Sequence, residues 1–157
     1  MNDGTRSEML RNEEIKAMKL FIPLFYSIYI IYDLVYYYVI PYFYQEEMGR
    51  PSNGLGIFIY VFLLMVFPIS VFLIKKGSPF QIKYLYFFAF LVLDFIDVLL
   101  IFWGTDTAYF NGNIVEVLFL IFAPTFVNKR FFWIVSSSLT LKYVIFGVLF
   151  QRINVVV

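Results

Sequence analysis

Five ionisable side chains interrupt the long apolar stretches of this sequence, and their chemistry is what most needs an explanation. They are Asp33, Asp94, Asp97, Glu116 and Lys142. A charged side chain is costly inside a bilayer, so such residues usually face the interior of a helix bundle and mark ligand, ion or proton sites. At a rise of about 1.5 Å per residue, Asp33, Asp94 and Lys142 lie roughly 15 to 20 Å from the basic end of their segments. That depth is close to the middle of a hydrocarbon core about 30 Å thick.

Lys142 is the one basic residue within an apolar segment of the sequence. An ammonium group facing lipid is expensive, so we expect Lys142 to face the bundle interior and to pair with Asp94 or Asp33. Asp97 shares a helix face with Asp94 because it follows three residues later. Glu116 lies near the start of its segment, 113–127, where a carboxylate can reach the interface and needs no partner.

Two tyrosines flank Asp33 at helical spacing. Tyr29 precedes it by four residues and Tyr36 follows it by three, so their hydroxyls are expected to border the carboxylate. The candidate intramembrane polar site therefore comprises Asp33, Asp94, Asp97, Lys142, Tyr29 and Tyr36. Two interpretations are open: a site that binds a ligand, senses protons or transmits a conformational change, or a buried ion pair that fixes helix register. Because the candidate site has three acidic residues for one basic residue, the functional interpretation stays open.

The composition argues against most catalytic chemistry. The sequence has no Cys and no His, which removes thiolate ligands, Cys nucleophiles and the commonest metal ligand and general base. The segment from Leu93 to Asp97 lacks the Gly-x-Gly-Asp motif of intramembrane aspartyl proteases. Gly-rich phosphate loops, metal motifs and Ser nucleophile elbows are also missing from the sequence. We therefore expect no enzymatic activity, no catalytic residue, no cofactor and no metal.

The elements that position these residues are long apolar helices. The chain has 157 residues, 62% of them hydrophobic, against the 45–50% or so that is usual in soluble domains. Stretches of about 20 apolar residues are long enough to span a bilayer. The sequence predicts an all-α polytopic membrane helix bundle, with residues 1–19 as a solvated cytoplasmic segment and residues 20–157 as the bundle. The five predicted transmembrane helices are 20–44, 54–74, 84–103, 113–127 and 131–150.

Lys and Arg are distributed unevenly between the loops. Nine of them lie in residues 1–19, 75–83 and 128–130, which fall on one side of the membrane if every helix spans it. Two lie on the other side, Arg50 and Arg152. The positive-inside rule then predicts a multi-pass protein of the cell membrane with a cytoplasmic N-terminus. We expect residues 155–157, three valines, to begin a sixth helix of a six-helix region, and the alternative is a complete five-helix protein.

Two short runs resemble the N-terminal multi-helix membrane region of Gram-positive bacterial signalling proteins. They are residues 32–38, YDLVYYY, and residues 122–133, FAPTFVNKRFFW. In such proteins this region precedes a cytoplasmic output domain, such as a histidine kinase, a diguanylate cyclase or an HD-type phosphohydrolase. The resemblance implies a membrane-embedded sensor or input module. It carries no family site residues over to this chain.

The leading hypothesis is therefore a sensor or input module of a bacterial signal-transduction protein. The alternatives are a small transport or substrate-binding membrane subunit and a non-catalytic membrane protein that binds partner helices. The expected partners are the lipid bilayer, other transmembrane helices or further copies of the chain, and a C-terminal cytoplasmic output domain. A net charge of +1 gives no sign of a nucleic-acid partner.

Overall fold

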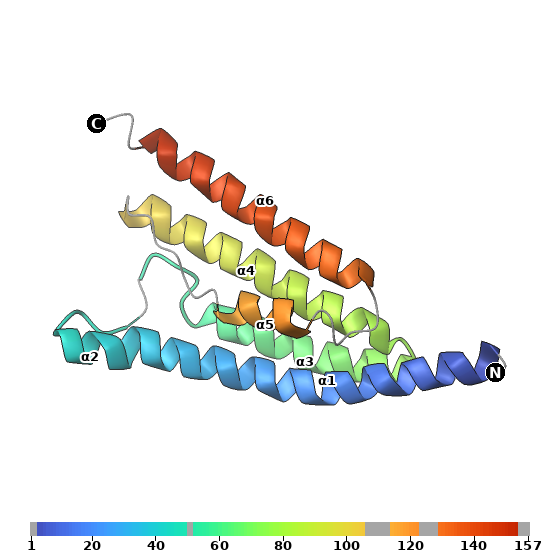
Figure 1. Cartoon of the computed structure of the whole chain (residues 1–157). Coiled ribbons are helices and arrows are strands. Elements are labelled where there is room, and N and C mark those ends of the chain that lie inside the picture. The colour runs from blue at the N-terminus through green and yellow to red at the C-terminus, as the bar shows by residue number, and fades with distance from the viewer. Residues whose placement is uncertain (1–2, 50–51, 106–113, 123–128, 154–157) are drawn as a thin grey trace.

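The computed structural model describes residues 3–49, 52–105, 114–122 and 129–153. All regular elements within these ranges are helices (Figure 1), which confirms the all-α prediction for the described part of the chain. The elements are α1 (Asp3–Leu34), the π-helical turn η1 (Val35–Val39), α2 (Ile40–Tyr44), α3 (Phe58–Lys76), the 3-10 turn η2 (Pro79–Gln81), α4 (Ile82–Thr105), α5 (Ile114–Phe122) and α6 (Lys129–Ile153).

Four helices in the described ranges are long and apolar enough to cross a membrane: Gly4–Tyr44, Phe58–Lys76, Pro79–Gly104 and Lys129–Gln151. Only 22% to 44% of the residues in their apolar windows are buried inside the bundle. Most apolar side chains therefore face outward, as they do in a protein whose solvent is lipid. The predicted fourth crossing, 113–127, corresponds to the nine residues of α5. The count of five crossings therefore stays a prediction, and the expected sixth helix at 155–157 lies outside the described residues.

The first helix is longer than its apolar part. α1, η1 and α2 follow one another without a gap, and α1 already includes most of the polar residues before Leu20. Pro41 has no N–H, so the carbonyl of Tyr37, four residues earlier, lacks its ordinary helical donor. The backbone N–H of Gly49 donates to that carbonyl at 2.8 Å. The φ of Gly49 is 112°, in the region that favours glycine, so the chain can turn back toward α3.

α3 begins at Phe58, four residues after the predicted start at Gly54. The reason is a contact with α4: the backbone N–H of Leu55 donates to Asp97 Oδ1 at 2.6 Å, which holds this stretch outside the helix. The other end of α3 closes as a helix normally does. Gly77, with φ of 83°, donates to the carbonyl of Ile74 at 3.1 Å, and the Ser78 N–H donates to that of Leu73 at 2.9 Å.

Figure 1 shows how the helices lie. α1 and α2 form one long rod along the lower edge of the view, α3 runs behind it, α4 crosses the middle and α6 lies along the upper edge. α4 and α6 run in the same direction, and the short α5 runs opposite to both. The N-terminal part of α1, the turn between α3 and α4, and the start of α6 all lie at the same end of the bundle.

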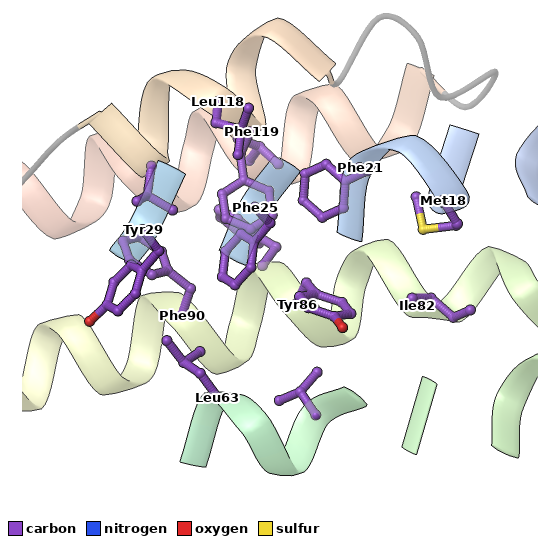
Figure 2. Close-up of a cluster of buried hydrophobic side chains, with 14 of the residues drawn as sticks. Met18, Phe21, Phe25, Tyr29, Leu63, Ile82, Tyr86, Phe90, Leu118 and Phe119 are labelled. Atoms are coloured by element: carbon purple, nitrogen blue, oxygen red, sulfur yellow. The ribbon is translucent and has the colours of Figure 1, made fainter. Parts of the chain in front are cut away.

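Aromatic rings fill the core between these helices (Figure 2). Phe119 of α5 is fully buried, and its ring centroid lies 5.4 Å from that of Phe21 and 5.8 Å from that of Phe25 on α1. On α4 it meets Phe87 at 5.3 Å and Phe90 at 6.0 Å. Ring pairs at these separations add stabilisation beyond the apolar area that they bury. α5 is therefore packed against both long helices, even though it is short.

Candidate functional site

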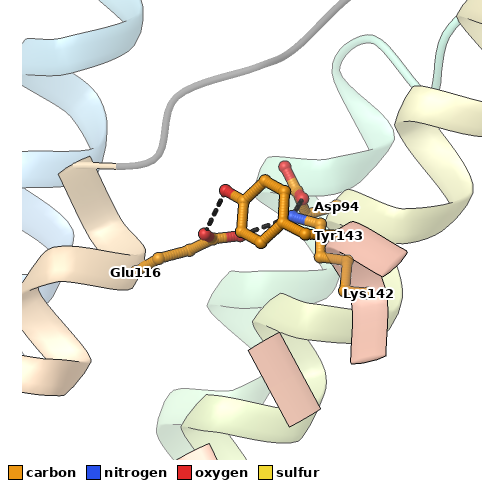
Figure 3. A network of polar contacts seen from close by, with 4 residues as sticks. All are labelled: Asp94, Glu116, Lys142 and Tyr143. Carbon is orange, nitrogen blue, oxygen red and sulfur yellow. Dashed lines mark hydrogen bonds and ion pairs between the residues drawn. The ribbon is translucent and has the colours of Figure 1, made fainter. Parts of the chain in front are cut away.

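Lys142 lies at the centre of a buried cluster of charged side chains. Its ammonium group donates to Asp94 Oδ2 and to Glu116 Oε1, and the Tyr143 hydroxyl donates to Glu116 Oε2 at 2.5 Å (Figure 3). Asp94, Glu116 and Lys142 are only 4%, 4% and 5% exposed. We call Asp94, Glu116, Lys142 and Tyr143 the Lys142 cluster. It joins three helices, because Asp94 comes from α4, Glu116 from α5, and Lys142 and Tyr143 from α6.

The apolar seam between α4 and α6 positions Lys142. The buried residues of α6 recur at steps of three or four along its inner face, which is the helical spacing. They are Phe131, Val135, Leu139, Lys142 and Phe146. Above and below the cluster, rings pair across the seam: Phe131 with Tyr84 at 5.1 Å, and Phe146 with Phe95 at 5.0 Å. These contacts fix the rotation of α6 so that Lys142 points at α4.

Of the two partners predicted for Lys142, Asp94 forms an ion pair with it, whereas Asp33 contacts α3. Asp33 is 4% exposed and accepts a hydrogen bond from the Tyr60 hydroxyl of α3. Tyr29 packs edge-on against the Tyr60 ring, with centroids 5.7 Å apart. Tyr36 stacks on Tyr32 at 5.6 Å. The first helix therefore holds its acid against α3, separately from the ammonium group of α6.

Asp97 is buried on α4, one turn beyond Asp94. Its contact with the Leu55 N–H ties the segment that enters α3 to α4. Gly54 lies against the same carboxylate: a Cβ at this position would be 2.6 Å from Asp97 Oδ1 and 3.0 Å from Ile101 Cγ1. The six predicted site residues thus do not form one site. Asp94 and Lys142 belong to the Lys142 cluster, Asp33 and Tyr29 contact Tyr60, Asp97 contacts Leu55, and Tyr36 stacks on Tyr32.

Glu116 was missed as a site residue from the sequence. Its place near the start of the predicted segment 113–127 suggested an interfacial carboxylate, but the structure buries it and pairs it with Lys142. One signal could have found it. Phe119 follows Glu116 by three residues, and side chains at that spacing share a helix face. The neighbours Val115 and Leu118 are buried as well, so Glu116 belongs to the inner side of α5.

A second buried ion pair lies near the start of α4 and was also missed. Lys83 Nζ lies 2.5 Å from Glu14 Oε1, and the two side chains are 0% and 1% exposed. The ammonium group also lies 5.7 to 5.9 Å from the ring centroids of Phe80, Tyr84 and Phe131. The expectation that residues 1–19 are solvated is therefore wrong for Glu14 and for Met18, which is fully buried.

The chemistry open to the Lys142 cluster is hydrogen-bond and proton exchange. Two carboxylates share one ammonium group, so the cluster carries one more acidic than basic group. A third group that bonded to either carboxylate would weaken its bond to Lys142 and alter the packing of α4 or α5 on α6. No group of three or more Asp and Glu residues in the described ranges is arranged to hold a metal ion.

Comparison with protein-family models gives a match over most of the chain. The family model MASE12 matches residues 12–157, which is nearly the whole chain. No curated protein and no solved structure matches the chain. The matched range includes all members of the Lys142 cluster, the Asp33–Tyr60 contact and the Glu14–Lys83 pair.

Proposed function

The chain belongs to the MASE12 family, and on this premise we propose that it is a membrane-embedded input module of a bacterial signal-transduction protein. MASE domains are membrane-associated sensor domains of signalling proteins. We further propose that the Lys142 cluster is the polar intramembrane site at which the signal acts. The observation that carries this proposal is a buried ammonium group held by carboxylates from two other helices.

The cluster has the features that a switch needs. Each of its two ion pairs joins α6 to a different helix, so breaking either one changes how α6 packs. Buried charges are costly to separate, which makes alternative arrangements discrete rather than graded. A signal that binds one arrangement better than the other shifts their populations by the difference in affinity. α6 is the element that would transmit this shift.

We propose that the chain crosses the membrane five times with its N-terminus in the cytoplasm. Since α4 and α6 run in the same direction (Figure 1), the chain must return across the bundle between Thr105 and Lys129. α5 is the described part of that return. The last turn of α3 contains Lys75 and Lys76, and the first turn of α6 contains Lys129 and Arg130. Both helix ends lie at the end of the bundle from which α1 starts (Figure 1), and the positive-inside rule assigns that end to the cytoplasm.

We propose no catalytic step within the chain itself. In this proposal the enzymatic output comes from another domain of the signalling protein, of the histidine kinase, diguanylate cyclase or HD-type phosphohydrolase class. The absence of Cys and His from the sequence supports this division of labour. Further copies of the chain are the expected membrane partners, and the net charge of +1 supports no nucleic-acid partner.

The test is a fusion of the full chain to a diguanylate cyclase domain through one added transmembrane helix after α6, which returns the cyclase to the cytoplasmic side, in inverted membrane vesicles. Formation of the cyclic dinucleotide is measured for the wild type and for Lys142→Met. We expect the variant to change the output rate by about fivefold or more, the size of a typical coupling between two sites.

The matched control is Leu141→Met, a neighbouring change on the outer face of α6, where Leu141 is 61% exposed. It should leave the rate unchanged. If Lys142→Met inserts and folds as the wild type does and yet gives the same rate, the cluster is not the input site.

A further inference from the structure

A pocket of about 400 Å³ lies between α5 and α6, beside the Lys142 cluster. It is lined by Glu116, Val117 and Leu120 of α5, and by Ser136, Leu139, Thr140 and Tyr143 of α6. Pockets of roughly 300 to 1,000 Å³ are the usual sites for small molecules. This pocket shares Glu116 and Tyr143 with the cluster, so an occupant would touch both hydrogen-bonded groups.

The lining combines apolar walls with a few polar groups. Val117, Leu120 and Leu139 supply apolar surface. Glu116, of which only 4% is exposed, presents the Oε2 atom to which the Tyr143 hydroxyl donates at 2.5 Å. The Thr140 hydroxyl donates to the Ser136 carbonyl, so it is an acceptor toward the pocket. This composition suits a molecule with an apolar body and a small polar head.

The charges select the kind of head. The cluster has two carboxylates for one ammonium group, and Asp97 lies one turn further along α4. The polar atoms beside the pocket are therefore mainly acceptors. A head that donates hydrogen bonds satisfies them, whereas an anionic head is repelled at short range in a medium of low dielectric.

The position of the pocket indicates how a ligand would arrive. Val117 and Leu120 are 48% and 37% exposed, and other exposed side chains of α5 and α6, such as Ile121 and Val144, are apolar too. Those faces meet lipid in the proposed topology. A molecule dissolved in the bilayer can enter without crossing water, and the polar head then finds the only strong acceptors that this lining offers.

We propose that this pocket binds a small membrane-soluble molecule that carries a hydrogen-bond-donating head, a hydroxyl or an ammonium group. The head bonds to Glu116 and to the Tyr143 oxygen, and the apolar body lies against Val117, Leu120 and Leu139. Binding weakens the bond between Glu116 and Lys142 and so changes the packing of α5 on α6. The inference rests on the proposed function and gives its site a ligand class.

The test uses the full chain in phosphatidylcholine nanodiscs and a photoreactive diazirine analogue of decanol. After illumination, mass spectrometry maps the labelled residues. We expect labels on Val117, Leu120 or Leu139, and we expect competition by decanol or decylamine but not by decane or decanoate. Competition by decanol alone identifies a neutral hydroxyl head, and competition by decylamine alone identifies an ammonium head.

Two variants examine the pocket and the head contact separately. Thr140→Phe fills the pocket from an exposed position and should abolish its labelling, while Tyr143→Phe should reduce labelling about fivefold or more through the lost hydrogen bond. Val144→Phe, at a position 57% exposed and outside the lining, is the matched control and should change nothing.

The inference would be overturned if labels were spread evenly over the lipid-facing residues. It would also be overturned if Thr140→Phe left the labelling of the pocket unchanged. Equal competition by decanoate would overturn the assignment of a donating head. Failure of the ligand inference can be told apart from failure of the proposed input function. If Lys142→Met changes the cyclase output while no probe labels the pocket, the input site stands without this ligand. Specific labelling with an output that no cluster variant changes would support a binding site and reject the input role.

Discussion

Lys142 is the side chain on which the interior of this bundle depends most. It interrupts an apolar seam, where any hydrophobic residue of similar volume would pack with α4 at no desolvation cost. Its two carboxylate partners come from different helices, so the charge holds α4, α5 and α6 in one register, within the rotation that the ring contacts set. The same two ion pairs can both fix the helix register and act as a switch. Since only a few groups hold the register, a change at those groups is enough to release it.

The balance of charge in the cluster predicts a rescue. Lys142→Met leaves Asp94 and Glu116 buried without their cation, and the free energy of unfolding should fall by about 3–5 kcal/mol. The triple variant Lys142→Met, Asp94→Asn, Glu116→Gln should recover much of that loss. Unfolding by denaturant in detergent measures both. A triple variant no more stable than the single one would show that Lys142 does not act through these carboxylates.

The Asp33–Tyr60 contact predicts a smaller effect. Tyr60→Phe removes the hydroxyl that donates to the buried carboxylate, and a hydrogen bond to a charged group is worth about 1.5–3 kcal/mol. The free energy of unfolding should fall by that amount. Tyr42→Phe is the control, since Tyr42 is 69% exposed, and it should leave stability unchanged. Equal effects of the two changes would mean that the contact contributes nothing specific.

The sequence was sufficient to predict that Lys142 pairs with Asp94 or Asp33, because their depths agree and a bare ammonium group is costly in lipid. It was not sufficient to exclude Asp33, which has a similar depth. Depth gives one coordinate along the membrane normal. The rotation of each helix about its axis gives the other, and here the packing of Phe119 and Phe131 decides it.

Among the helices, the N-terminal half of α1 departs most from its prediction. Glu14, Met18, Phe21, Phe25 and Tyr29 are all buried at steps of three or four residues. The buried stripe therefore starts before the apolar segment does. Its first member is a carboxylate, so an interpretation based on hydropathy alone begins the bundle too late. A polar residue at helical spacing from an apolar stripe is the sequence signal that indicates this earlier start.

The Glu14–Lys83 pair should hold this half of α1 against α4. Lys83→Met leaves a buried carboxylate without its cation and should reduce stability by about 3 kcal/mol. It should also speed proteolysis at Arg6 and Arg11. The exchange Glu14→Lys with Lys83→Glu restores the pair but should recover only part of the loss, because three aromatic rings near Lys83 favour a cation at that position. A full recovery would show that the rings do not discriminate.

Two glycines give a matched comparison. At Gly54 a Cβ would meet Asp97 Oδ1 at 2.6 Å, whereas at Gly147 on α6 a Cβ would meet nothing within 4 Å. Gly54→Ala should destabilise the bundle by about 1–3 kcal/mol through overpacking. Gly147→Ala should be neutral or stabilise by up to about 1 kcal/mol, since alanine is the better helix former. Thermal unfolding of both variants checks the difference, and equal shifts would contradict the close approach of Gly54 to α4.

For the molecule as a whole, composition was enough to predict a helical membrane bundle. The bounds of α4 and α6 lie within three residues of the predicted segments 84–103 and 131–150, whereas α1 starts at Asp3, well before residue 20. α5 differs from the other predicted helices because hydropathy does not show how it is packed. Its nine residues are apolar enough for a crossing but are packed against α1 and α4 through Phe119. Whether a short apolar segment spans the membrane or is enclosed by other helices depends on the helices that pack against it. Hydropathy is computed from the segment alone and contains no information about those helices.

The side of the membrane on which α4 ends and α6 begins can be tested by cysteine labelling. The natural sequence has no Cys, so no native thiol contributes background labelling. Single cysteines at the exposed positions Tyr44, Trp103, Lys76 and Lys129 are reacted with a membrane-impermeant maleimide in intact cells. Five crossings with a cytoplasmic N-terminus predict labelling of Tyr44→Cys and Trp103→Cys, with Lys76→Cys and Lys129→Cys reacting only after lysis. The comparison of Trp103→Cys with Lys129→Cys is decisive. α4 and α6 can run in the same direction across a bilayer only if these two positions lie on opposite sides, so labelling of both from outside would require α5 to be re-entrant and the proposed topology to be abandoned.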